Sequence, residues 1–177
     1  MQKFISISGF SVFSVFSVFS VFSVFLAICL SACSGGKVED KYPGQPVKHR
    51  QESFKNILNA FEPLGLMRRG ERKFDASTFQ NSLQNLEKYS QSDELLWKYF
   101  DKNLPTTDAP SRSKTAIWED FSAFENSIND YKNAVKNFAE VVAKNSEETQ
   151  NFENTEIQNA YDEVHQQCRN CHKKFRK

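Results

Sequence analysis

The sequence lacks an excess of charge of either sign and lacks the alternating pattern of β-strands. It has 23 Lys and Arg residues against 22 Asp and Glu residues. No basic surface is therefore expected to bind nucleic acid, and there is no acidic tail. Because no run of alternating apolar and polar residues is present, we expect an all-α protein.

The first part of the chain is almost free of charge. No charged residue occurs from Ile5 to Leu30, and the triplet Ser-Val-Phe repeats from Ser11 to Phe25. About 20 apolar residues could span a bilayer, but serine recurs at every third position. The segment ends in Leu30-Ser31-Ala32-Cys33, which has the small residues of a signal-peptide cleavage site. It resembles the bacterial lipobox, in which the cysteine receives lipid.

We therefore predict a signal peptide over residues 1–32, lipid on Cys33 and a flexible tether over residues 33–43. A plain signal peptide or an uncleaved anchor is the alternative. Several acyl chains anchor a protein stably, whereas a single chain binds a membrane only marginally. Because the chain would be exported, we expect the mature protein on the periplasmic side of a Gram-negative membrane. Residue 34 is serine rather than aspartate, which by analogy with lipoprotein sorting favours the outer membrane. Residues 44–177 suit one folded domain.

Cysteine is scarce in the part of the chain that follows the predicted signal peptide. Beside Cys33 there are only Cys168 and Cys171, too few for a four-ligand zinc site. A redox dithiol normally opens a helix after a strand, and no strand pattern precedes this pair. His172 follows directly, and C-x-x-C-H is the signature of haem attachment. On a helix these three side chains share one face, so they can hold one covalent haem c and its iron from the same side.

Periodic apolar residues predict four helices. The first begins near Pro46, kinks or weakens after Pro63 and ends at Gly70; the others cover about residues 77–89, 116–144 and 153–175. Asp75 and Thr115 are the expected caps of the second and third helices, and residues 90–93 look like a break. A long loop covers residues 103–113. This pattern predicts an antiparallel four-helix bundle, a fold that holds cofactors between facing helices.

The domain resembles the cytochrome c′ family from about residue 47 to its C-terminus. The likeness rests on residues 47–54 with their Arg-Gln pair, on Phe61, Gly70 and residues 74–76, on Ile117-Trp118, and on residues 168–176 with an aromatic-Arg pair after the histidine. The resemblance implies that Cys168 and Cys171 hold the haem and that His172 is the axial iron ligand. The residues that it implies around the haem are Arg50 near a propionate, Phe54 over the open iron face, Trp97 and Phe100 closing the distal pocket, and Arg176 beside the axial histidine. The alternative is solvated arginines and core aromatics; Trp118 is assigned to the core.

A sixth iron ligand is hard to find. Met67, the one methionine beyond the predicted signal peptide, lies about three and a half helical turns from Phe54. His165 shares a helix face with His172, and His49 would point about 100° away from Arg50. We therefore expect five-coordinate iron with an apolar open face, which suits small neutral gases.

The first hypothesis is a non-catalytic protein that binds NO and CO reversibly and protects against nitrosative stress. The alternative is an electron carrier between the membrane and a redox partner protein. A haem-free bundle with a coincidental motif is a third possibility. Family members are often homodimers through their first two helices, although Pro63 puts that packing in doubt here.

Overall fold

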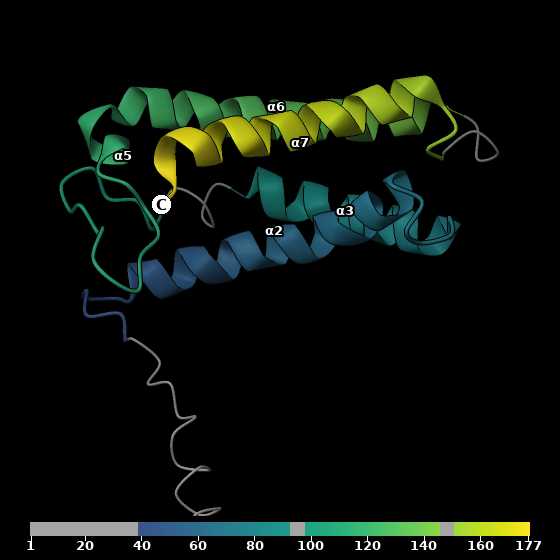
Figure 1. Cartoon of the computed structure of the whole chain (residues 1–177). Coiled ribbons are helices and arrows are strands. Elements are labelled where there is room, and N and C mark those ends of the chain that lie inside the picture. The colour runs from purple at the N-terminus through teal and green to yellow at the C-terminus, as the bar shows by residue number, and fades with distance from the viewer. Residues whose placement is uncertain (1–38, 93–97, 146–150) are drawn as a thin grey trace, which may run out of the picture. The chain divides into compact units, whose positions relative to one another are not determined.

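The computed structural model describes residues 39–92, 98–145 and 151–177. These residues form helices α2 (Pro46–Arg68), α3 (Ala76–Gln91), α5 (Ala116–Glu119), α6 (Phe121–Lys144) and α7 (Thr155–Phe175), and no strand. Helix α2 lies beside α3, α6 lies beside α7, and α3 also packs against α6 (Figure 1). Successive long helices run in opposite directions. The predicted all-α four-helix bundle is confirmed, and Glu39–Lys177 form one compact unit.

Helix α2 covers the range that the sequence predicts. Pro46 lies in its first turn, as expected, and Pro63 and Gly65 lie inside the helix. Leu64 is fully buried on the core side of this turn, and its burial compensates for the backbone hydrogen bond that Pro63 cannot donate. The helix ends at the predicted place. Gly70 has φ 72°, a left-handed conformation that glycine adopts at little cost.

Helix α3 begins at the predicted cap and ends inside the predicted break. The Asp75 carboxylate accepts a hydrogen bond from the Thr78 backbone N–H at 2.7 Å. The break expected over residues 90–93 begins two residues later, because α3 continues to Gln91 and Ser92 is extended. Ser90 is fully buried there, and its hydroxyl pairs with the Tyr131 hydroxyl at 2.6 Å. A small side chain with a hydrogen-bond partner is tolerated inside the bundle.

Replacing Asp75 with asparagine tests this cap, because asparagine keeps an acceptor oxygen and loses the charge. Hydrogen bonds from Thr78 and then Ser77 lower the pKa of Asp75 from 3.8 to about 2. A lowered carboxyl pKa stabilises the folded state above the unfolded pKa, and this contribution is lost as the pH falls through the folded pKa. We expect D75N to have the lower thermal midpoint at about pH 7. The difference should shrink below about pH 4 and vanish near pH 2, as circular dichroism would show. A difference that is independent of pH would contradict this assignment.

The predicted third helix is divided in two. Helix α5 ends at Glu119, and Asp120 has φ −139° and ψ 73°, outside the helical region. The Asp120 carboxylate then accepts from the Ala123 backbone N–H at 3.0 Å and caps α6. Thr115, the expected cap, makes no capping hydrogen bond through its side chain. The prediction of one helix is wrong here because an aspartate side chain competes for backbone N–H groups.

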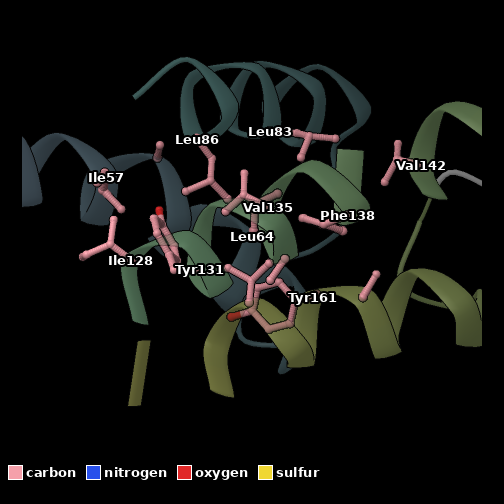
Figure 2. Close-up of a cluster of buried hydrophobic side chains, with 14 of the residues drawn as sticks. Ile57, Leu64, Leu83, Leu86, Ile128, Tyr131, Val135, Phe138, Val142 and Tyr161 are labelled. Atoms are coloured by element: carbon pink, nitrogen blue, oxygen red, sulfur yellow. The ribbon is translucent and has the colours of Figure 1, made fainter. Parts of the chain in front are cut away.

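The core lies between the four long helices (Figure 2). Leu64 comes from α2, Leu83 and Leu86 from α3, Val135 and Phe138 from α6, and all are buried. The inward stripe of α6 continues through Phe124, Ile128, Tyr131 and Val142, which are also buried. On α7, capped by Asn154, the Tyr161 ring stacks on Phe61 at 4.8 Å between centroids. Within the described ranges, no helix is long and apolar enough to cross a membrane.

Candidate functional site

A cavity of about 900 Å³ is lined by α2 on one side and by α7 on the other. Its size falls in the range of about 300–1,000 Å³ that is usual for cofactor and ligand sites. Aromatic and aliphatic side chains form much of its wall, among them Phe54, Phe61 and Phe100. Arginines also line it, including Arg112, Arg169 and Arg176. The cavity therefore suits a large planar apolar group that carries acidic substituents.

The three residues of the C-x-x-C-H motif line this cavity from α7. Cys168 and Cys171 are half-buried free thiols. Burial raises the pKa of both thiols to about 11. A redox dithiol needs an accessible thiolate with a lowered pKa, so this environment is wrong for disulfide exchange. It fits cysteines that are consumed by covalent attachment to a cofactor.

His172 has the protonation state that iron binding needs. Burial, and then the charge of Arg176, lower the pKa of His172. Since the ordinary histidine pKa is about 6.5, the imidazole is neutral at about pH 7 and has a free donor nitrogen. The Arg176 backbone N–H also donates to the His172 carbonyl oxygen at 3.0 Å. Arg176 thus acts on His172 electrostatically, as the family resemblance implies.

Arg50 lines the cavity from α2, but its guanidinium is already engaged. It is only 3% exposed, and burial lowers its pKa to about 10. Its two terminal nitrogens donate to the Thr106 hydroxyl at 2.5 Å, the Thr106 carbonyl at 2.7 Å, the Ser111 hydroxyl at 2.9 Å and the Tyr99 carbonyl at 3.4 Å. These contacts hold residues 99–111 against α2. Contact of Arg50 with a haem propionate stays a prediction, and Arg50 does line the cavity.

The aromatic residues expected around the cofactor differ in their surroundings. Phe54 is half-buried, lies four residues after Arg50 on α2 and lines the cavity. Phe100 is buried, lines the cavity and packs on Phe124 with 4.8 Å between ring centroids. Trp97 lies outside the described residues. Trp118 packs against the core as predicted, and its indole N–H donates to the Asp101 carbonyl at 2.8 Å.

Comparison with known proteins decides which family this architecture represents. Residues 45–176 match the family model described as Cytochrome C′. The chain belongs to the cytochrome c′ family. Its cofactor is therefore a covalently attached c-type haem, and the cavity and the donor set described above fit that group.

Individual relatives agree with this assignment. The cytochrome c′ of Rubrivivax gelatinosus is 29% identical over 136 residues, which cover 76% of this chain and 95% of the relative. Its crystal structure superposes with a TM-score of 0.61 at 26% identity, covering 78% of this chain and all of the other. The cytochrome c′ of Shewanella frigidimarina gives a TM-score of 0.65 at 22% identity, covering 78% and 99% of the two chains. A nitric oxide complex of a cytochrome c′ variant from Alcaligenes xylosoxidans shares the fold at 20% identity, with a TM-score of 0.61 and coverage of 78% and 99%.

Of the other candidate ligands of this cytochrome c′, Met67 and His49 lie outside the cavity wall and His165 belongs to it. Met67 is buried in the core. The His49 ring stacks on Tyr99 at 4.9 Å, and its Nδ1 lies 3.5 Å from Glu52. Among the residues that the structure describes, two histidines line the cavity, His165 and His172, and no methionine does. Both histidines belong to α7.

Two parts of the cavity wall could not be found from the sequence. The first is the rim at Arg112 and Ser113, where Ser113 forms an isolated antiparallel bridge with Arg176. The second is the meeting of Gly65 with Tyr161, where a β-carbon on residue 65 would lie 2.9 Å from the tyrosine hydroxyl. A glycine inside a helix is a signal of close approach, but it does not identify the partner. The rim has no local signal, because it joins a loop to the end of α7.

Proposed function

We propose that this cytochrome c′ binds small neutral gases, NO and more weakly CO, at a five-coordinate haem iron. The observation that carries the proposal is the composition of the two cavity walls. Within the described part of the chain, the histidines of the cavity come from α7 alone, and the facing wall on α2 presents Phe54. Phe54 has no donor atom, so this wall would leave a haem held from α7 free to bind an external ligand.

Each residue of the site has a separate task in this proposal. When bound, the haem supplies an iron centre that accepts diatomic ligands. Cys168 and Cys171 would hold it, and His172 would supply a neutral nitrogen to the iron. Phe54 keeps water and anions out, because an apolar wall offers no hydrogen bond to compensate for their desolvation. The solved nitric oxide complexes of the Alcaligenes xylosoxidans relative support this choice of ligand.

We further propose that reversible binding, rather than catalysis, protects the cell against nitrosative stress. We propose that the protein lies on the periplasmic face of a membrane, held by lipid on Cys33. The outer membrane is preferred over the inner membrane. Cys33 lies outside the described residues, so this part rests on the sequence of residues 30–33. Mass spectrometry of the purified mature protein would detect the acyl chains.

Absorption spectra of the ferrous protein and its NO complex test the gas-binding proposal. We expect a broad five-coordinate ferrous spectrum and a large change when NO is added. The F54M variant is a matched reference, because a thioether at this position should give a six-coordinate, low-spin spectrum with a sharp α band. Such a band in the unmodified ferrous protein would contradict the proposal and favour the electron carrier. Staining of the denatured protein for covalent haem checks the attachment separately.

A further inference from the structure

One end of the bundle carries a group of positive charges that gas binding does not use. We call it the C-terminal cationic surface, and its members are Arg112, Lys114, Lys173, Lys174, Arg176 and Lys177. All are exposed except Lys114, which is half-buried. From Arg169 to Lys177 the chain has five Lys and Arg residues and no acid, although the whole sequence is nearly neutral. The charge is therefore concentrated in one place.

Backbone contacts hold this surface together. The Lys114 backbone N–H donates to the Phe175 carbonyl at 2.9 Å, and the Lys177 N–H donates to the Arg112 carbonyl at 2.8 Å. The Lys177 ammonium also donates to the Thr107 carbonyl at 2.7 Å. Acidic residues also lie at this end. Asp120 is 3.8 Å from the Lys174 ammonium, and Asp108 accepts from the Tyr42 hydroxyl. Asp40 in the entering segment and Glu119 in α5 are further acids here, and together they offset part of the charge.

The chain enters the domain at this same end. The start of α2 and the C-terminus lie at one end of the bundle, and the α2–α3 connection lies at the other (Figure 1). Two hydrogen bonds join this end of the chain to the loop of residues 99–111. The Tyr42 hydroxyl donates to the Asp108 carboxylate at 3.2 Å, and the Gln51 amide donates to the Pro110 carbonyl at 2.9 Å. Asp40 accepts from the Lys48 backbone N–H at 3.0 Å, which fixes the entering segment against α2.

The short segment between Cys33 and Glu39 keeps the start of α2 close to the proposed lipid anchor. Five residues, 34–38, separate Cys33 from Glu39. Even fully extended, the chain from Cys33 to Glu39 spans no more than about 22 Å. The far end of α2 is more distant by the length of the helix, about 35 Å for its 23 residues. An anchored domain therefore presents its entry end to the membrane more readily than its far end.

We propose that the C-terminal cationic surface rests on anionic phospholipid headgroups and turns the haem end of the domain toward the membrane. Each lysine or arginine near an anionic surface strengthens binding about fivefold. The proposal rests on the lipid anchor proposed above, and it adds an orientation that an anchor alone does not impose. Arg112 and Arg176 also line the cavity. The gas site thus lies next to the bilayer, where an apolar gas is more soluble than in water.

The test uses the haem-loaded domain of residues 34–177, exported with an ordinary signal peptide so that no acyl chain contributes. In the described part of the chain the buried hydrophobic residues lie between Val47 and Phe175, within the compact unit, so this form is expected to fold without the anchor. Sedimentation is measured with vesicles of phosphatidylcholine mixed with phosphatidylglycerol and with phosphatidylcholine alone. We expect binding only to the mixed vesicles. It should be lost when ionic strength rises from about 0.01 M to 1 M, because the screening length falls from about 30 Å to 3 Å.

Two double variants with the same charge change identify the surface. K173Q/K174Q removes two cations of the C-terminal cationic surface and should weaken binding about fivefold for each lysine. K73Q/K144Q removes two exposed cations at the far end of the bundle and should leave it unchanged. Equal loss in both, or no preference for anionic vesicles, would overturn the proposal. So would salt-sensitive binding to polyglutamate but not to vesicles, which would assign the surface to an acidic protein. The ferrous-NO spectrum of the same samples reports separately on gas binding.

Discussion

Replacing Phe54 with alanine is expected to speed CO binding to the ferrous protein about tenfold or more. A tenfold change corresponds to removing about 1.4 kcal/mol from the entry barrier. The reason is steric, because Phe54 lines the cavity from α2, on the wall that faces the haem-attachment residues of α7. Truncation opens the space that a diatomic ligand must enter. Flash photolysis of the CO complex measures the rate directly.

The control for this experiment is F74A, which removes the same atoms at a surface position. Phe74 is 44% exposed, lies between α2 and α3, and does not line the cavity. Its truncation should leave the CO rate unchanged. If F54A also binds CO at the original rate, Phe54 does not control entry, and the distal face must be assigned to other residues.

Replacing Phe138 with alanine should cost about 3–5 kcal/mol of the free energy of unfolding, the usual range for a large aromatic residue in a core. Phe138 is 0% exposed. Its ring meets the Phe79 ring edge-on at 6.3 Å between centroids and the Tyr161 ring at 6.1 Å. Alanine would remove these contacts from three helices at once and leave a cavity. Urea unfolding of the haem-loaded protein, with linear extrapolation to water, gives the difference.

The same F74A protein serves as the stability control. An exposed aromatic residue that contacts Phe79 from one side should lose about 0.5 kcal/mol or less. A loss below about 1 kcal/mol in F138A would mean that the neighbouring helices close over the missing ring. Under folding conditions the ferrous-NO spectrum of F138A should be unchanged, because Phe138 does not line the cavity.

The parts of the fold that could be predicted depend on local spacing. The stripe of α6 and the Asp75 cap require only residues within a few positions of each other, and both are confirmed. The break at Asp120 could not be predicted, because an aspartate fits the exposed face of a continuous helix equally well. The extension of α3 through Ser90 depends on the Tyr131 hydroxyl, 41 residues away. Neither the break at Asp120 nor the extension of α3 can be predicted from the residues next to it in the sequence.

The residues of the site also fall into those that local spacing predicts and those that depend on distant parts of the chain. Cys168, Cys171 and His172 share a helix face by their spacing, and the cavity wall contains all three, with Phe54 on the wall across from them. The contacts of Arg50 with residues 99–111 could not be predicted from the sequence. Its partner Thr106 is 56 residues away, and a loop with two prolines gives no indication of where it folds. The rim at Arg112 and Ser113 could not be predicted for the same reason, because Ser113 pairs with Arg176, which is distant in the sequence.

The contacts of Arg50 set which substitutions the loop of residues 99–111 can accept during evolution. Two of its four acceptors are backbone carbonyls, at Tyr99 and Thr106, and they persist whatever side chains these positions carry. The other two are the side-chain hydroxyls of Thr106 and Ser111. The sequence of the loop can therefore vary, provided that these two positions keep an acceptor oxygen. Lysine is no substitute for Arg50, since one ammonium cannot match the planar fork that reaches these acceptors. Among homologues, the arginine and the two hydroxyl positions should therefore change together.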